Sequence, residues 1–138
     1  MKLSLSILTP DKEILKEEVD ELVVPTVTGE LGILPNHASL LTQILPGELR
    51  VINAGKTHSF AITGGYLEVN NNQVNILGDY AIRSEEIEVA KAEEAKKKAE
   101  NRMKEKVSEE DFAIIEADLR RSLLELKVAR KHRTNRPQ

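Results

Sequence analysis

The hydrophobic period of the chain changes once, near Ser84, and that change limits the folds open to it. Before Ser84, apolar and polar residues alternate in short runs, as in residues 2–8 (KLSLSIL) and 66–70 (YLEVN). A period of two is typical of strands with one buried face. After Ser84 the chain is rich in Ala, Glu and Lys, which are strong helix formers. The sequence therefore predicts a β domain over residues 1–83 and a helical part over residues 84–138.

Turn chemistry separates the strand-like runs. Asparagine and glycine occur at residues 53–56 (NAGK) and 70–72 (NNN), and both types tolerate the positive φ of tight hairpin turns. No helical pattern lies between the runs, so we predict an antiparallel β-sandwich or flattened barrel. The pair Gly64-Gly65 indicates a bulge or a close approach of backbones within the chain, with the close approach of a neighbouring subunit as the alternative.

Two helical segments follow, and they are separated by residues 107–111 (VSEED). Ser108 followed three residues later by Asp111 is typical of a helix start, so the segments should form an antiparallel hairpin. At roughly 0.8 kcal/mol per buried CH₂ group, an alanine-rich seam contributes only a few kcal/mol. We therefore hypothesise that the hairpin opens in some functional state. The expected seam residues are Val89, Ala92, Ala95, Ala99 and Met103 on the first helix, and Phe112, Ile115, Leu119, Leu123 and Leu126 on the second.

Composition excludes several classes of site. The chain has no Cys, so it can form neither disulfides nor thiolate metal sites. Aromatic residues make up 3% and Trp is absent, which leaves little for stacking on nucleic-acid bases. No run approaches the ~20 apolar residues of a membrane-spanning helix, and we expect neither a secretory signal nor direct membrane insertion. The charges are concentrated after Ser84, and residues 127–136 form a basic tail with five Lys or Arg.

Residues 28–41 (TGELGILPNHASLL) hold the one constellation that resembles a site. As an enzyme, the chain would use His37 and Glu30 as base and acid. However, no G-x-S-x-G elbow surrounds Ser39, and none of the three histidines lies at metal-ligand spacing from another. From the residues alone, His37 is more simply a turn or interface histidine.

Four stretches resemble the ε subunit of the F-type ATP synthase, the small central-stalk subunit of the bacterial rotary enzyme. The most specific is residues 28–37 (TGELGILPNH), followed by residues 61–77 (AITGGYLEVNNNQVNIL). Residues 7–14 (ILTPDKEI) and 80–92 (YAIRSEEIEVAKA) match the family's opening strand and its passage into the helices. The resemblance covers essentially the whole chain in order.

This resemblance implies a non-catalytic subunit with no required cofactor or metal, and no nucleic-acid partner. It would lie on the cytoplasmic face of the inner membrane, where its sandwich couples the γ subunit to the rotor c-ring. Its hairpin would reach the α/β catalytic head and inhibit ATP hydrolysis, with basic side chains facing acidic segments of the β subunits. The implied interface residues are Glu30, Leu31, Ile33 and His37 in the sandwich, and Arg120, Arg121, Lys127, Arg130 and Lys131 in the hairpin.

Some members of this family bind ATP at the hairpin through an [IL]-D-x-x-R-A motif and arginines of the second helix. The motif reads IEVAKA at residues 87–92 here, so Glu88 and Lys91 replace Asp and Arg. Lysine does not reproduce the guanidinium fork of arginine. Arg121 is the expected basic partner, but Glu125 stands one turn later, where it would repel phosphate. A nucleotide-sensing module that binds ATP through Glu88, Lys91 and Arg121 is the alternative function.

Overall fold

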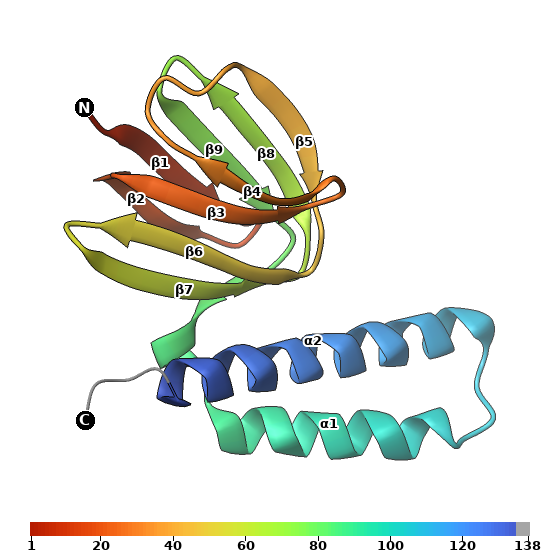
Figure 1. Cartoon of the computed structure of the whole chain (residues 1–138). Coiled ribbons are helices and arrows are strands. Elements are labelled where there is room, and N and C mark those ends of the chain that lie inside the picture. Colours follow the sequence, from red (N-terminus) through yellow and green to blue (C-terminus); the bar gives the residue numbers. More distant parts are fainter. Residues whose placement is uncertain (135–138) are drawn as a thin grey trace. The chain divides into compact units, whose positions relative to one another are not determined.

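Residues 1–83 form a strand-rich unit, and a second unit begins at Ser84 (Figure 1). The computed structural model describes residues 1–134, with side chains through Lys131. The rest of the predicted basic tail, to Arg136, lies outside the described residues.

The first unit contains ten strands joined by short turns. The alternation of buried and exposed residues is clearest in the opening strand, where Leu3, Leu5 and Ile7 are buried. The strands are β1 (Leu3–Leu8), β2 (Glu13–Val19), β3 (Glu21–Thr26), β4 (Gly29–Ile33), β5 (Leu40–Ile44), β6 (Gly47–Asn53), β7 (Lys56–Ile62), β8 (Gly65–Asn70), β9 (Gln73–Gly78) and β10 (Ala81–Arg83).

The strands pair in the order β10-β7-β6-β3-β5-β8-β9-β1-β2, with β4 paired to β3. This nearly closed sandwich confirms the predicted fold class. The antiparallel prediction fails at one place, since β1 runs parallel to β9, with Leu5 opposite Val74 and Ile7 opposite Ile76. Hairpins generate only antiparallel neighbours, so the parallel pair arises because the first strand returns to close the sheet beside a late one.

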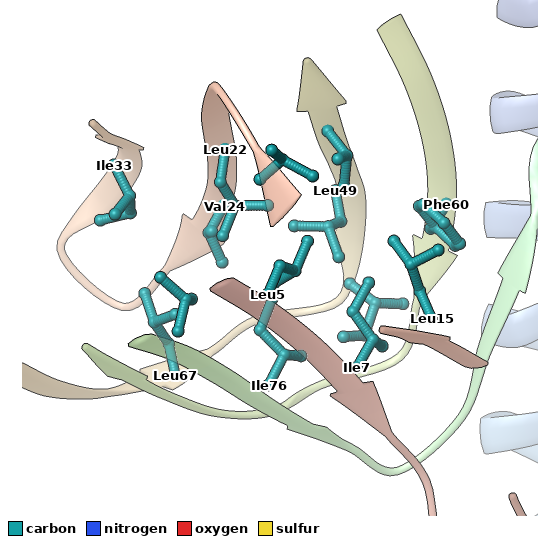
Figure 2. Close-up of a cluster of buried hydrophobic side chains, with 14 of the residues drawn as sticks. Leu5, Ile7, Leu15, Leu22, Val24, Ile33, Leu49, Phe60, Leu67 and Ile76 are labelled. Carbon is teal, nitrogen blue, oxygen red and sulfur yellow. The ribbon is translucent and has the colours of Figure 1, made fainter. Parts of the chain in front are cut away.

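The inward faces of the strands form one apolar core. Leu5, Ile7, Leu49, Phe60 and Ile76 point toward one another in Figure 2, and each is at most 1% exposed. Full burial of such side chains stabilises the fold by roughly 1.5–3 kcal/mol each. This core fixes which side of every strand faces outward, and therefore which residues can meet a partner.

Two tight turns use the left-handed backbone region, although not always at the expected residues. Asn71 and Asn72 have φ of 51° and 64°. In the β6–β7 turn the positive φ falls on Ala54 and Gly55, at 52° and 78°, so Asn53 is not the residue that adopts it. The close approach predicted at the glycine pair lies within the chain. A Cβ on Gly65 would lie 2.0 Å from the Leu77 carbonyl oxygen.

The second unit is the predicted antiparallel helical hairpin. It contains a short 3₁₀ helix η1 (Ser84–Glu86), α1 (Val89–Met103) and α2 (Glu109–Thr134) (Figure 1). As predicted, Ser108 begins α2, since its Oγ accepts a hydrogen bond of 3.1 Å from the Asp111 amide. Arg130 of α2 donates to Glu93 of α1 at 3.1 Å and joins the two helices.

The helical seam differs from the predicted stripe at three residues. Ala92 and Ala99 are buried on α1, but Ala95 is exposed and Lys96 is half-buried in its place. On α2, Phe112 and Leu123 are 39% and 45% exposed. Each of the three lies three residues from a buried position, which at about 100° per residue places it about 60° to one side, at the edge of the buried stripe. The buried residues of α2 are Ile115, Ser122, Leu126, Val128 and Ala129.

Candidate interaction surfaces

The loop between β4 and β5 presents a compact turn. The His37 amide donates to the Leu34 carbonyl oxygen at 3.2 Å, and Asn36 has φ of 68°. Pro35 and a residue of positive φ at the two central positions are the features of a type II turn. Leu34 is 55% exposed, so the turn carries an apolar side chain outward beside polar ones.

The structure divides the four candidate residues of the 28–41 stretch. Glu30 is exposed on β4 and forms an ion pair with Arg50 of β6. Leu31 is partly buried against the core, and His37 is half-buried in the loop. The prediction that Ile33 is an interface residue is wrong, because its side chain lies within the core and is 0% exposed. The stretch is also less of a loop than the interface interpretation assumed, because residues 29–33 form β4 and pair along β3.

No acid–base pair is assembled at this stretch. Nδ1 of His37 lies 2.7 Å from the Ala38 carbonyl oxygen and donates to it. Ser39 Oγ donates to Asn70 at 3.3 Å, and Glu30 is held by Arg50. A general base needs a nucleophile within hydrogen-bond reach and a group that orients it. These three side chains are instead engaged with other groups, so the structure does not join them into such an arrangement.

A row of exposed apolar side chains crosses the outer face of β1, β9 and β8. Leu8 is opposite Leu77, and Leu77 is opposite Tyr66, in the registers of the paired strands. Leu77 and Tyr66 are 55% and 56% exposed, and Leu41 on neighbouring β5 is also exposed. We call Leu8, Leu77 and Tyr66 the apolar row; on β5 the residue opposite Tyr66 is Gln43, and Leu41 is opposite Glu68. Contiguous apolar surface of this kind marks contact sites for other proteins.

The predicted basic residues of the hairpin are all exposed, but the arginines already have acidic neighbours. Arg120 pairs with Glu116 at 2.6 Å, and Arg130 pairs with Glu93. Lys127 has no ion pair within the described part of the chain. Exposed pairs of this kind contribute at most about 1 kcal/mol, so an acidic partner can replace them.

The three candidate ATP residues are not brought together into a phosphate site. Lys91 pairs with Glu88 at 3.0 Å at the start of α1, and Arg121 pairs with Glu125 at 3.1 Å. Arg130 lies beside Glu93, so Lys91 lies beside the last turns of α2. Arg121 precedes Arg130 by nine residues, which is roughly 14 Å along the axis of α2. The residues present therefore do not fit a nucleotide in this arrangement, and ATP binding stays a prediction.

Comparison with known proteins identifies the family. The model of the ATP synthase delta/epsilon chain β-sandwich domain matches residues 2–84, and that of the delta/epsilon long α-helix domain matches residues 85–130. The ATP synthase epsilon chain of Herpetosiphon aurantiacus is 44% identical over 133 residues, covering 96% of this chain and 98% of the relative. The chain belongs to the ATP synthase epsilon chain family. The epsilon chain of Chloroflexus aggregans is likewise 44% identical over 138 residues, covering 100% and 99% of the two chains.

Solved assemblies contain chains of similar structure. In the Euglena gracilis mitochondrial ATP synthase OSCP/F1/c-ring assembly, one chain matches with a TM-score of 0.72 and 28% identity, over 95% of this chain and 82% of that chain. A chain of the Tetrahymena thermophila central stalk/c-ring assembly matches with a TM-score of 0.64 over 94% and 97%, and its 18% identity shows the fold alone.

Sequence reasoning missed part of the exposed surface that this epsilon family chain presents. Leu34 and the apolar row were not singled out, although Leu8, Tyr66 and Leu77 interrupt otherwise alternating strands at outward positions. That signal becomes readable only when the strand register is known, because a one-residue shift exchanges the two faces. Within residues 1–134, no helix is long and apolar enough to cross a membrane.

Proposed function

We propose that the chain is the epsilon subunit in the central stalk of an F-type ATP synthase, where it joins the γ subunit to the rotor c-ring and restrains ATP hydrolysis. The observation that carries the proposal is the match to epsilon chains over the full length of the chain. Further support comes from the similar chain in the Euglena gracilis OSCP/F1/c-ring assembly. The subunit is then peripheral, on the cytoplasmic face of the inner membrane, and proton transport and phosphoryl chemistry take place in other subunits.

Strand β4 and the loop that follows it are the proposed rotor-ring contact. Glu30, Leu31 and His37 contribute as the resemblance implies, and exposed Leu34 takes the role expected of buried Ile33. Apolar side chains provide the buried centre of a contact, and polar neighbours provide its rim and its orientation. The pairing of Glu30 with Arg50 keeps the carboxylate on a rigid strand while leaving it 61% exposed.

The apolar row is the proposed contact for the γ subunit. It lies on rigid, fully paired strands, so little conformational entropy is lost when a partner covers it. Tyr66 is an amphipathic anchor of the kind that is enriched in interface centres. A partner here removes from water the large apolar side chains that the sandwich leaves exposed.

The hairpin is the proposed brake on hydrolysis. On the α1 side of the seam the buried residues are two alanines, whose methyl groups contribute roughly 1–2 kcal/mol, while α2 contributes larger side chains such as Ile115 and Leu126. A difference of a few kcal/mol between two states is within reach of a binding partner. Arg120, Lys127 and Arg130 then meet acidic segments of the catalytic head, where complementary charge steers and orients the docked helix.

Matched pairs of variants separate the two sandwich contacts. His37→Ala should weaken binding of the full chain to purified rotor ring at least about tenfold, which corresponds to roughly 1.4 kcal/mol. His58→Ala is the control, because His58 is also half-buried but lies on β7. Leu77→Asp should weaken γ binding, and Val27→Asp, at a residue 50% exposed in the β3–β4 turn, should not. Equal affinities within either pair would contradict the assignment of that surface.

A further inference from the structure

The asparagine turn between β8 and β9 is bonded to the loop between β4 and β5. Backbone pairing of β5 with β8 ends at Leu40 opposite Val69. Beyond that point side chains continue the connection. Ser39 Oγ donates to Asn70 Oδ1 at 3.3 Å, and the Asn36 amide donates to Asn72 Oδ1 at 2.6 Å. Two segments more than thirty residues apart are therefore joined at this end of the sandwich.

Asn72 is itself rigidly held. Its carbonyl oxygen accepts a hydrogen bond of 2.8 Å from the Ser4 amide, which fixes the turn to β1. Its side-chain nitrogen donates to the Met1 sulfur at 3.6 Å. Its φ of 64° is one that asparagine tolerates better than most residues. The Asn72 carboxamide is thus a fixed acceptor rather than a mobile surface group.

The loop needs this acceptor because its own turn leaves the Asn36 amide unused. The hydrogen bond that closes the turn runs from the His37 amide to the Leu34 carbonyl oxygen. The amide of the preceding residue, Asn36, donates its hydrogen bond to Asn72 Oδ1. A backbone donor and a side-chain acceptor at 2.6 Å therefore fix the centre of the turn that carries Leu34 and His37.

We propose that Asn72 is a positioning residue for the rotor-ring contact, and that it holds the turn at residues 34–37 in its binding conformation before the ring arrives. The inference rests on the proposed function, in which this loop meets the ring. A loop that is already ordered loses less conformational entropy on binding, so the hydrogen bond increases affinity without touching the partner.

Three variants of the full chain test the role of this one acceptor. Asn72→Gly removes the carboxamide but keeps a residue that adopts positive φ freely. Asn71→Gly is the matched control, because Asn71 has φ of 51° and its side chain has no hydrogen bond within residues 1–134. Asn72→Asp restores an oxygen acceptor at the same place. Urea midpoints of all three, followed by tyrosine fluorescence, show whether the sandwich remains folded.

The first readout is the water-exchange rate of the Asn36 amide, measured by NMR on the isolated chain. Loss of a typical hydrogen bond corresponds to a factor of about five. Asn72→Gly should raise the exchange rate about fivefold, while Asn71→Gly and Asn72→Asp should leave it unchanged. The second readout is affinity for purified rotor ring, which should fall about fivefold for Asn72→Gly and remain unchanged for Asn71→Gly.

An unchanged Asn36 exchange rate in Asn72→Gly would overturn the proposal, and so would faster exchange with unchanged ring affinity. These failures differ from failure of the proposed function itself. If Leu34→Ala and His37→Ala also leave ring affinity unchanged, the loop is not the ring contact, and both claims fall. If those two variants weaken ring binding while Asn72→Gly does not, only the positioning role is overturned.

Discussion

Replacing Gly65 with alanine should strongly destabilise the sandwich. Gly65 begins β8 opposite Gly78 of β9, and its φ is +142°. An alanine Cβ at this position would lie 2.0 Å from the Leu77 carbonyl oxygen and 2.8 Å from the Gly78 Cα. Both neighbours are backbone atoms, so no side-chain rotation can relieve the contact.

Two separate costs set the magnitude. A non-glycine residue in such a sparsely populated backbone region costs about 1–3 kcal/mol. Relieving the overlap requires β8 and β9 to separate locally, and overpacking of this kind typically costs about 1–3 kcal/mol or more. We expect a total loss of about 4 kcal/mol, which is a large fraction of the roughly 5–15 kcal/mol that stabilises a domain.

Gly29→Ala separates the two costs. Gly29 also has a positive φ, +109°, but a Cβ there meets nothing within 4 Å. It should therefore show the backbone strain without the overlap. The assay is urea unfolding of the full chain followed by tyrosine fluorescence. The chain has no Trp, and both tyrosines, Tyr66 and Tyr80, lie in the first unit, so the signal reports on the sandwich.

Gly65→Ala should unfold at a markedly lower urea concentration than Gly29→Ala, with a difference of at least about 2 kcal/mol. Only a Cβ on Gly65 overlaps neighbouring backbone atoms. Equal destabilisation by the two substitutions would therefore refute a steric cost at Gly65. It would mean that β8 and β9 can separate at this point without measurable cost.

Three further substitutions test other parts of the fold. Ala54→Asn should raise stability by about 0.5–1 kcal/mol in the same urea assay, because alanine at φ of 52° is strained and asparagine tolerates that region; a loss would contradict this. The hydrogen bond from the Ala54 amide, helped by the Lys2 ammonium, holds the pKa of the Asp20 carboxyl below its usual 3.8. Asp20 therefore stabilises the fold above about pH 3.8 and less as pH falls through its lowered pKa. The difference in unfolding free energy between the unsubstituted chain and Asp20→Asn should shrink below pH 4. A difference that does not depend on pH would contradict this link between stability and the ionisation of Asp20. Ile115→Ala, at a residue 1% exposed, should cost about 2–4 kcal/mol and reduce helical circular dichroism at 222 nm, whereas Ile114→Ala, at 59% exposed, should have little effect. Equal helicity of the two variants would show that the seam does not run through Ile115.

The sequence predicted the architecture well where one period was unambiguous. The alternation at residues 2–8 and the three asparagines at residues 70–72 predicted a strand and a tight turn, and both are present. The capping pattern at Ser108 also predicted the start of α2 within a residue. In each case the local pattern and the tertiary environment favour the same conformation, which is when local reasoning succeeds.

Other features could not be predicted because they depend on long-range packing. The charged run EILKEEV of β2 and the glycines of β4 carry weak strand signals, and pairing with neighbouring strands decides their conformation. Burial of Ile33 follows from the β3–β4 register rather than from its loop-like surroundings. In the hairpin, Glu93 pairs with Arg130 across the seam, and no spacing within one helix predicts that pair.

The central claim is that the sandwich couples the rotor while the hairpin restrains hydrolysis. Its most direct test is the rate of ATP hydrolysis by the cognate rotary complex, rebuilt with the full chain or with a chain ending at Arg83. Hydrolysis should be faster with the shortened chain and should remain coupled to proton pumping. Equal hydrolysis rates in two fully assembled complexes would contradict it and show that the hairpin is not a brake in this enzyme.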